Sequence, residues 1–173
     1  MLFEESGYTE VRKWSPSEPK IEIRSGSYDV YARATIEENC YKSEKLPLVV
    51  AEGRALPPLT FYLEAWGAIK GKVIFPEDQV PQSVIVALQK VKRRKPVPVG
   101  SLLRPMNQKW LNLARNQNSY SYQYLSPGLY YLAASLSYNG PICAEAFVEV
   151  EDRTVFQDLV AEPFDLSQGV ILY

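Results

Sequence analysis

The fold is decided by residues 119–130, which run Ser119-Tyr120-Ser121-Tyr122-Gln123-Tyr124-Leu125-Ser126-Pro127-Gly128-Leu129-Tyr130. Three tyrosines alternate with polar residues here, and a period of two is typical of a β-strand with one buried face. Pro127-Gly128 predicts a tight chain reversal, because proline fixes φ at one residue and glycine permits a positive φ at the next. Residues 129–135 then predict a second strand.

Strand patterns recur along most of the chain. Short runs rich in strand-forming residues are separated by clusters of Pro, Gly, Asn and Asp, which is typical of a sandwich or barrel. The further strands expected are residues 28–34, 46–51, 60–63, 69–75, 83–89 and 144–150. Residues 101–115 fit either a helical face or a strand at 110–113 paired with 120–124. We favour the hairpin, because Pro105 lies within the alternative helix.

The composition narrows the classes of function. The chain has 173 residues, a net charge of −1, two cysteines and no histidine. Without histidine, Ser-His and Cys-His catalysis and His-ligated metals are excluded, and no other catalytic, metal or cofactor pattern is recognised. The balanced charge gives no reason to expect nucleic-acid binding, and no apolar stretch predicts direct membrane insertion. We therefore expect neither an enzyme nor a cofactor.

Two parts of the chain resemble each other. Gly26-Ser27-Tyr28-Asp29-Val30-Tyr31-Ala32 aligns with Gly128-Leu129-Tyr130-Tyr131-Leu132-Ala133-Ala134, and Val50-Ala51-Glu52 aligns with Val160-Ala161-Glu162. This predicts two β modules, a partial one at 1–65 and a complete one at 66–173, with no counterpart of 69–88 in the first. An incomplete module exposes apolar edges, so we expect neighbouring modules of the same longer chain as partners.

Two segments of the second copy resemble a known family. The segment Gly67-Ala68-Ile69-Lys70-Gly71-Lys72-Val73-Ile74, followed by the series at 119–130, is similar to carboxypeptidase-regulatory-like modules. The resemblance implies an all-β, transthyretin-like (prealbumin-like) sandwich with Ig-like, Greek-key strands. It implies structural roles for Gly71, Tyr120, Tyr122, Pro127, Gly128 and Tyr130, and for Gly26 and Tyr28 in the first copy. The first copy has Ser25-Gly26 in place of Pro-Gly, and Asn118-Ser119 replaces the family's Asp-Gly.

The same resemblance suggests a class of function. Such modules serve as spacers, folding aids or binding accessories in secreted and cell-envelope proteins. We therefore expect a non-catalytic structural or interaction module of a larger bacterial protein, extracellular or in the cell envelope, that contacts protein or polysaccharide at the cell surface. The first residues have no signal-peptide pattern, so a cytoplasmic location stays open. The alternative function is a carbohydrate-binding accessory domain.

Three groups of residues are candidate sites. Trp110 and Tyr124 could form an aromatic surface that stacks on sugar rings, if they are exposed, or could pack in the core. Lys92, Arg93 and Arg94, in a basic run that begins at Lys90, could contact an anionic ligand or could simply cover a solvated loop. The cysteines, Cys40 and Cys143, are expected to be free and partly buried, because one falls in each copy.

Overall fold

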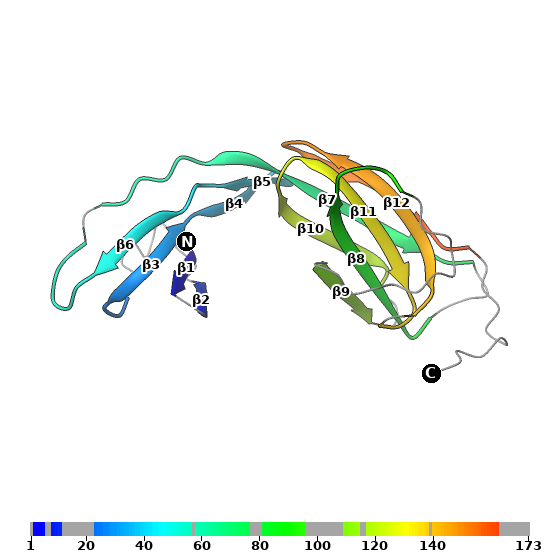
Figure 1. Ribbon diagram of the computed structural model, residues 1–173, viewed down its shortest axis with the longest axis horizontal. Helices are drawn as coiled ribbons and strands as arrows, with labels where there is room; N and C mark the ends of the chain where they lie inside the picture. The colour runs from blue at the N-terminus through cyan, green and yellow to red at the C-terminus, as the bar shows by residue number, and fades with distance from the viewer. Residues whose placement is uncertain are drawn as a thin grey trace. The chain divides into compact units, whose positions relative to one another are not determined.

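The computed structural model describes residues 2–5, 8–11, 23–56, 58–76, 81–95, 109–114, 117–138 and 140–162, the first two ranges by their backbone alone. Within these ranges the protein is all-β, with fourteen strands and no helix (Figure 1). Consequently no helix in the described part is long and apolar enough to cross a membrane. The chain divides into two compact units, Met1–Trp66 and Gly67–Tyr173.

The first unit holds a four-stranded antiparallel sheet in the order β2-β1-β3-β6. Its strands are β1 (Leu2–Glu5), β2 (Tyr8–Val11), β3 (Gly26–Tyr31) and β6 (Leu46–Val50). A second pair, β4 (Arg33–Ile36) and β5 (Asn39–Lys42), forms a hairpin. β5 also pairs with the first residues of the long strand β7 (Glu64–Ile74).

Alternate residues of β3 and β6 form the core of the first unit. Tyr28 lies directly opposite Leu48, and both are buried with Val30 and Val50. The residues between them in each strand, such as Asp29 and Val49, are exposed. One face of this pair is therefore buried and the other largely exposed, as the period-two pattern of the sequence requires.

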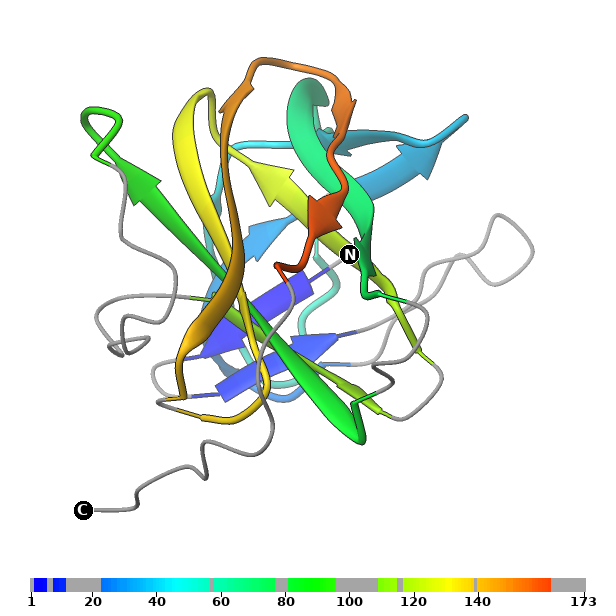
Figure 2. The same cartoon turned by 90° about the vertical axis from the view of Figure 1, so that its right-hand side faces the viewer.

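The second unit has two layers. One is an antiparallel sheet in the order β9-β8-β11-β12, in which β11 and β12 run side by side in yellow and orange in Figure 2. In the other layer β7 pairs with β10 on one side and with β13 and β14 on the other. The strands are β8 (Ser83–Val91), β9 (Lys109–Ala114), β10 (Ser119–Leu125), β11 (Gly128–Ser135), β12 (Ile142–Val150), β13 (Thr154–Phe156) and β14 (Leu159–Val160).

A single apolar cluster joins the two layers of this unit. Ile69 and Val73 of β7 pack with Val86 of β8 and with Leu132 of β11, and all four are almost completely inaccessible to solvent. Burial of side chains from facing sheets in one core is what a β-sandwich requires. The second unit is therefore consistent with a β-sandwich.

One predicted strand and one predicted strand pairing are wrong. Residues 60–63 form no strand; Leu59 and Phe61 pack on the first core while Tyr62 points to solvent. The alternation of apolar and exposed residues there arises because one side of an extended segment is partly buried, and it does not indicate pairing with another strand. β9 is a strand as predicted, but it pairs with β8 and not with β10, because the chain crosses from one layer to the other between β9 and β10.

The predicted match of Val50 with Val160 in the repeat is also wrong. Val160 lies in β14, parallel to Ile74 of β7, whereas Val50 lies antiparallel to Gly26. The residue opposite Gly128 is Val150, so Val150 occupies the position that corresponds to Val50. The sequence also matches Leu56 and residues 60–63 of the first copy with Leu166 and residues 170–173, and the latter residues lie outside the described part of the chain.

The two four-stranded sheets have the same order of antiparallel strands. β1 lies beside β3 in the first unit as β8 lies beside β11 in the second, and β2 and β9 are the next strands outward. The first unit thus has a strand at the position of residues 83–88, where the sequence predicted none.

Candidate functional site

The tyrosine that follows each glycine turn makes the same hydrogen bond in both units. The Tyr130 hydroxyl donates to the Ser126 carbonyl oxygen at 2.8 Å, and the Tyr28 hydroxyl donates to the Arg24 carbonyl oxygen at 3.1 Å. Each bond reaches back four residues and ties the buried ring to the start of its own turn, as in a tyrosine corner. These two tyrosines therefore brace turns.

Lys90, the first cation of the basic run, closes the turn in front of Tyr130. Its ammonium group donates to Ser126 Oγ at 2.8 Å and to the Pro127 carbonyl oxygen at 2.6 Å. Gly128 has a φ of 145°, and a Cβ atom there would lie 2.6 Å from Lys90 Cε. The turn therefore needs glycine for its backbone conformation, and a Cβ atom would also displace the end of the Lys90 side chain.

The other two family-pattern tyrosines, Tyr120 and Tyr122, lie inside the sandwich. The Tyr122 hydroxyl donates to the Val86 carbonyl oxygen at 2.6 Å, and that of Tyr120 donates to the Gln157 carbonyl oxygen. Burial is the main cause that raises the pKa of both phenols; the charge of Asp158 adds to it at Tyr120. Both rings are core residues whose hydroxyls link separate strands.

Gly71 lies where the segment between β13 and β14, which runs parallel alongside β7, comes closest to that strand. A Cβ atom at this position would overlap the Gln157 carbonyl oxygen and would lie 2.9 Å from the Tyr120 hydroxyl. Only glycine leaves room for both groups beside β7. Gly26, which begins β3, lies opposite Val50, as Gly128 lies opposite Val150 in the second unit.

The two residues expected to share an aromatic surface lie in different sheets. Trp110 is on β9, and its half-buried ring lies 5.0 Å from the ring of Tyr138. Tyr124 is on β10, where its φ of 56° marks a break in the register with β7. The expected surface depended on a β9–β10 hairpin, and that hairpin is not formed.

Trp110 instead belongs to an apolar face of the β9-β8-β11-β12 sheet that was not predicted from the sequence. It lies opposite Ala87 of β8, which lies opposite Ala133 of β11, and both alanines are fully buried. Tyr131 and Phe147 lie in the neighbouring row, with ring centroids 5.2 Å apart. The signal was available, because both alternating sets of residues on β8 and β11 are apolar and not only the set that faces the core.

The charged residue Glu145 lies beside Tyr131 on this apolar face. The Tyr131 hydroxyl donates to Glu145 Oε2 at 2.8 Å. Burial, together with this bond and the charge of the carboxylate, raises the pKa of the Tyr131 phenol. The phenol thus stays neutral and holds the carboxylate in place.

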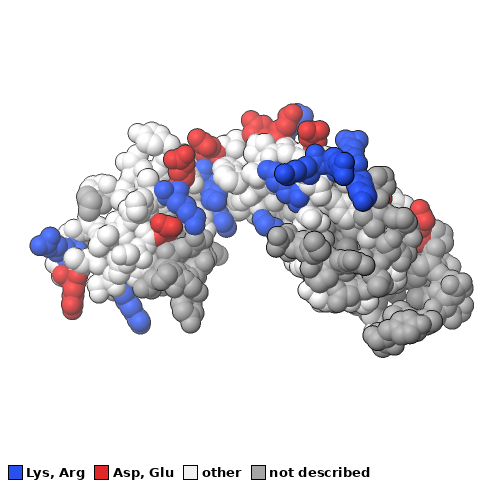
Figure 3. Space-filling model, in the orientation of Figure 1, with Lys and Arg blue, Asp and Glu red and all other residues white. Residues whose placement is uncertain are grey.

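The rest of the basic run has a different environment from Lys90. Lys92, Arg93 and Arg94 are exposed in the loop after β8, and none of them forms an ion pair with any described residue. Figure 3 shows this blue patch above the second unit. The loop is strongly cationic, but no contact in the described structure fixes its side chains.

A more organised group of cations lies in the first unit, around Tyr31. Arg33 Nη2 donates to the Tyr31 hydroxyl at 3.2 Å, and its guanidinium carbon lies 5.0 Å from the ring centroid. The Lys42 ammonium lies 5.0 Å from the same centroid and 4.6 Å from the ring of Trp66. Each aromatic contact of this kind contributes about 0.5–2 kcal/mol.

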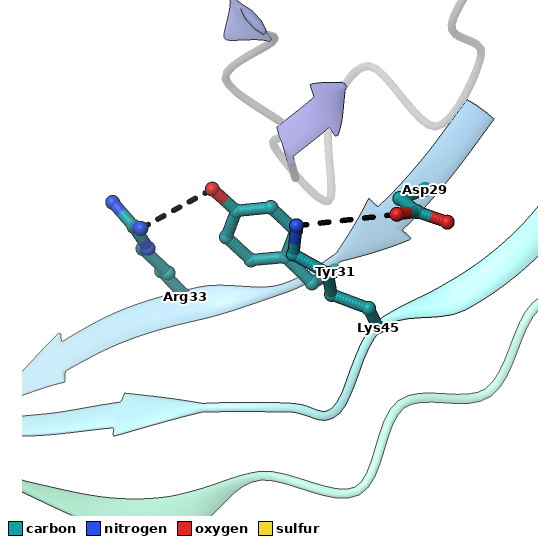
Figure 4. Close-up of polar contacts among 4 residues, drawn as sticks. All are labelled: Asp29, Tyr31, Arg33 and Lys45. Carbon is teal, nitrogen blue, oxygen red and sulfur yellow. Dashed lines mark hydrogen bonds and ion pairs between the residues drawn. The ribbon is translucent and has the colours of Figure 1, made fainter. Parts of the chain in front are cut away.

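Lys45 completes the group, which we call the Tyr31 cation cluster (Tyr31, Arg33, Lys42 and Lys45). Its ammonium lies 5.7 Å from the Tyr31 centroid and 4.0 Å from Asp29 Oδ2 (Figure 4). This cluster was not predictable from the sequence, because its cations are dispersed over thirteen residues and only the strand arrangement brings them together.

Both cysteines of the chain lie in the described part of the structure. Cys40 and Cys143 are both free and buried, as expected for cysteines in separate copies. The Cys143 thiol donates to the Ala134 carbonyl oxygen at 3.3 Å, and burial raises its pKa to about 11. Among the described residues, no group of three or more Cys, Asp or Glu side chains is arranged to hold a metal ion.

Comparison of the chain with known proteins identifies no relative. No family model, no curated protein and no solved structure matches the chain.

Proposed function

We propose that the protein is a non-catalytic structural and interaction module of a larger exported or cell-surface protein, which spaces or presents its partners. It would consist of two related transthyretin-like sandwich modules, of the carboxypeptidase-regulatory-like kind. The observation that carries the proposal is the shared order of four antiparallel strands, with a tyrosine corner at the same place in each unit.

The agreement between the units extends to individual residue pairs. Tyr28 lies opposite Leu48 and Tyr130 lies opposite Val148, and all four side chains are buried. A duplicated unit of this kind is typical of proteins built from modules in series, in which each module contacts its neighbours along the chain. The function of such a series is to hold binding surfaces at a set distance.

The hydroxyl groups of the core tyrosines also support a structural role. Those of Tyr120, Tyr122 and Tyr130 each donate to a backbone carbonyl group of another strand or turn. Groups used in this way stabilise the sandwich and are not available to orient a sugar. With Tyr28, four of the twelve tyrosines of the chain brace the backbone in this way.

The mechanical behaviour of the full chain tests this proposal. A spacer must resist extension, so pulling on the two ends should give two separate unfolding steps, with length increments expected for units that meet between Trp66 and Gly67. A single continuous extension at low force would show that the chain cannot act as a spacer.

One observation favours the second candidate, carbohydrate binding. Trp110 and Tyr138 form an aromatic pair, and Tyr138 is 58% exposed. Electrophoresis of the full chain through gels that contain neutral polysaccharides tests this candidate. Retardation that Tyr138→Ser abolishes would support it, provided that Tyr62→Ser, which removes another exposed ring, leaves the retardation unchanged. Unretarded wild-type protein would exclude the tested sugars and favour the spacer.

A further inference from the structure

Four consecutive cations leave the second sheet directly after β8. We call them the basic loop (residues 92–95, Lys-Arg-Arg-Lys), and all four are exposed. β8 ends at Val91, whose partner on β11 is Leu129, and no backbone hydrogen bond joins the basic loop to another described residue. Its four side chains likewise form no hydrogen bond or ion pair within the described part of the chain. The ordered contacts therefore end with Lys90 and Val91.

The sequence of the basic loop favours an extended chain. Consecutive like charges repel one another and extend a segment. Lys95 precedes Pro96, and a residue before proline is disfavoured in the helical region and prefers extended backbone dihedrals. An extended segment binds to another protein as an added strand when its own backbone groups are not already paired. Among the described residues the basic loop meets this condition, whereas β8 does not, because it pairs with β9 and β11.

Extended, unpaired segments are the form in which endoproteases bind their substrates, and strands within a sheet are protected until the sheet opens. A basic residue before the cleaved bond is recognised by an acidic pocket, as in trypsin. Two consecutive basic residues fill two such pockets and form charge-assisted hydrogen bonds in each. The pairs Lys-Arg and Arg-Arg occur in this chain only at residues 92–94.

We propose that the basic loop is a processing site, cut after Arg93 or Arg94 by an endoprotease that recognises paired basic residues. The step is hydrolysis of one peptide bond. The carbonyl carbon of the arginine takes the hydroxyl of a water molecule and becomes a carboxylate, while the released nitrogen takes protons and becomes a new amino terminus. The partner is thus a protease whose substrate cleft carries acidic pockets for two successive cations.

The strand pairing indicates that the two fragments stay together after the cut. β7 and β8 lie on the amino-terminal side of the cut, and the strands from β9 to β14 lie on the other side. In one layer β8 pairs with β9 and β11, and in the other layer β7 pairs with β10, β13 and β14. Val86 of the first fragment shares a core with Leu132 of the second. Processing therefore yields a two-chain sandwich rather than a released piece.

Digestion of the native full chain with kexin, a serine endoprotease that requires Lys-Arg or Arg-Arg before the cleaved bond, tests access to the site. The value of kcat/KM should be within about tenfold of that for a synthetic peptide of residues 88–98, because no opening of the fold is needed. A site that requires unfolding is cut about a thousandfold or more slowly than the peptide, since few molecules are unfolded at any time. That result would overturn the proposal.

Two variants with the same loss of charge separate recognition of the basic pair from general attraction. Arg93→Gln with Arg94→Gln should abolish cleavage by kexin. The matched control, Lys92→Gln with Lys95→Gln, keeps the Arg-Arg pair and should still be cut after Arg94. All four side chains are exposed, so both variants should keep the urea midpoint of the wild type. Equal loss of cleavage in both variants would show that charge alone matters and would refute recognition of the pair.

Two further measurements test the product and its natural occurrence. The cut chain should give two bands in denaturing electrophoresis and a single species at the elution volume of the intact chain in native gel filtration; fragments that separate without denaturant would exclude the two-chain form. Mass spectrometry of the protein isolated from the cells that make it should detect chains that end at Arg93 or Arg94. Recovery of only the uncut chain there would overturn a processing role even if kexin cuts the loop.

Discussion

Gly71→Ala tests whether the close approach of Gln157 to β7, between the parallel strands β13 and β14, stabilises the second unit. The backbone of Gly71 does not have a positive φ, so alanine can adopt its conformation and any cost is steric. A Cβ atom would overlap the Gln157 carbonyl oxygen and lie 2.6 Å from the Gln157 carbonyl carbon. Because these are backbone atoms, the chain around Gln157 has to move.

The magnitude follows from the bonds that this movement breaks. Gln157 N–H donates to the Lys70 carbonyl oxygen at 2.8 Å, and the Gln157 carbonyl oxygen accepts from Tyr120. Each bond contributes about 1 kcal/mol, and leaving the buried Tyr120 hydroxyl unpaired costs about 1–3 kcal/mol more. Alanine lowers the entropy of the unfolded chain, which offsets about 0.4–1 kcal/mol. The expected loss is about 2–4 kcal/mol in the free energy of unfolding.

Urea unfolding of the full chain, followed by circular dichroism, measures this loss. Gly53→Ala is the matched control, because Gly53 has a φ of 70° and no atom within 4 Å of an added Cβ. It should cost only about 1 kcal/mol, from backbone conformation alone. If Gly71→Ala destabilises the chain no more than Gly53→Ala does, Gln157 is not tightly packed against β7 and the reasoning is refuted.

Three further predictions concern the tyrosines and a thiol. Tyr28→Phe and Tyr130→Phe should each cost about 1 kcal/mol in urea unfolding, since each removes one corner bond and keeps its ring; negligible cost at both would refute a bracing role. The pKa values of Tyr120, Tyr122 and Tyr131 are raised in the folded chain, so folding favours the neutral phenols. Their contribution to the free energy of unfolding should be fully present below pH 10.0, the pKa of the unfolded chain, and should fall as the pH rises above that value. A urea midpoint that stays constant above pH 10.0 would contradict this. Cys143, with its pKa raised to about 11, should react with Ellman's reagent at pH 8 only after unfolding in urea; rapid reaction in the native chain would show that the thiol is accessible.

Local patterns predicted most strands because burial on a sheet leaves a period-two signal. Residues 119–125 alternate buried tyrosines with exposed serine and glutamine, and the structure has β10 there. Pro127-Gly128 likewise predicted the turn, since its requirement for glycine is local to the backbone. Both features depend on neighbouring residues in the sequence.

Strand pairing was not predictable in the same way. An extended segment such as residues 59–62 alternates in burial without any partner strand, and β9 joins β8 although β10 follows it directly. Pairing depends on which layer the chain enters after a turn, and no residue within the strand encodes that choice. The alignment of Val50 with Val160 was wrong for the same reason, because similar short strands at a domain edge can belong to different sheets.

The two groups of cations show why a candidate site was harder to predict than a strand. Lys92, Arg93 and Arg94 are adjacent in sequence and easily recognised, yet in the described structure no partner fixes them and they project from a loop. The cations around Tyr31 are separated in sequence and become neighbours only through the register of β4 and β5 and the turn before Lys45. Binding affinity depends on positioned charge more than on the number of charges, because each freely moving side chain has to be ordered by the ligand. Of the two groups, the Tyr31 cation cluster is the one whose cations are positioned by contacts in the described structure.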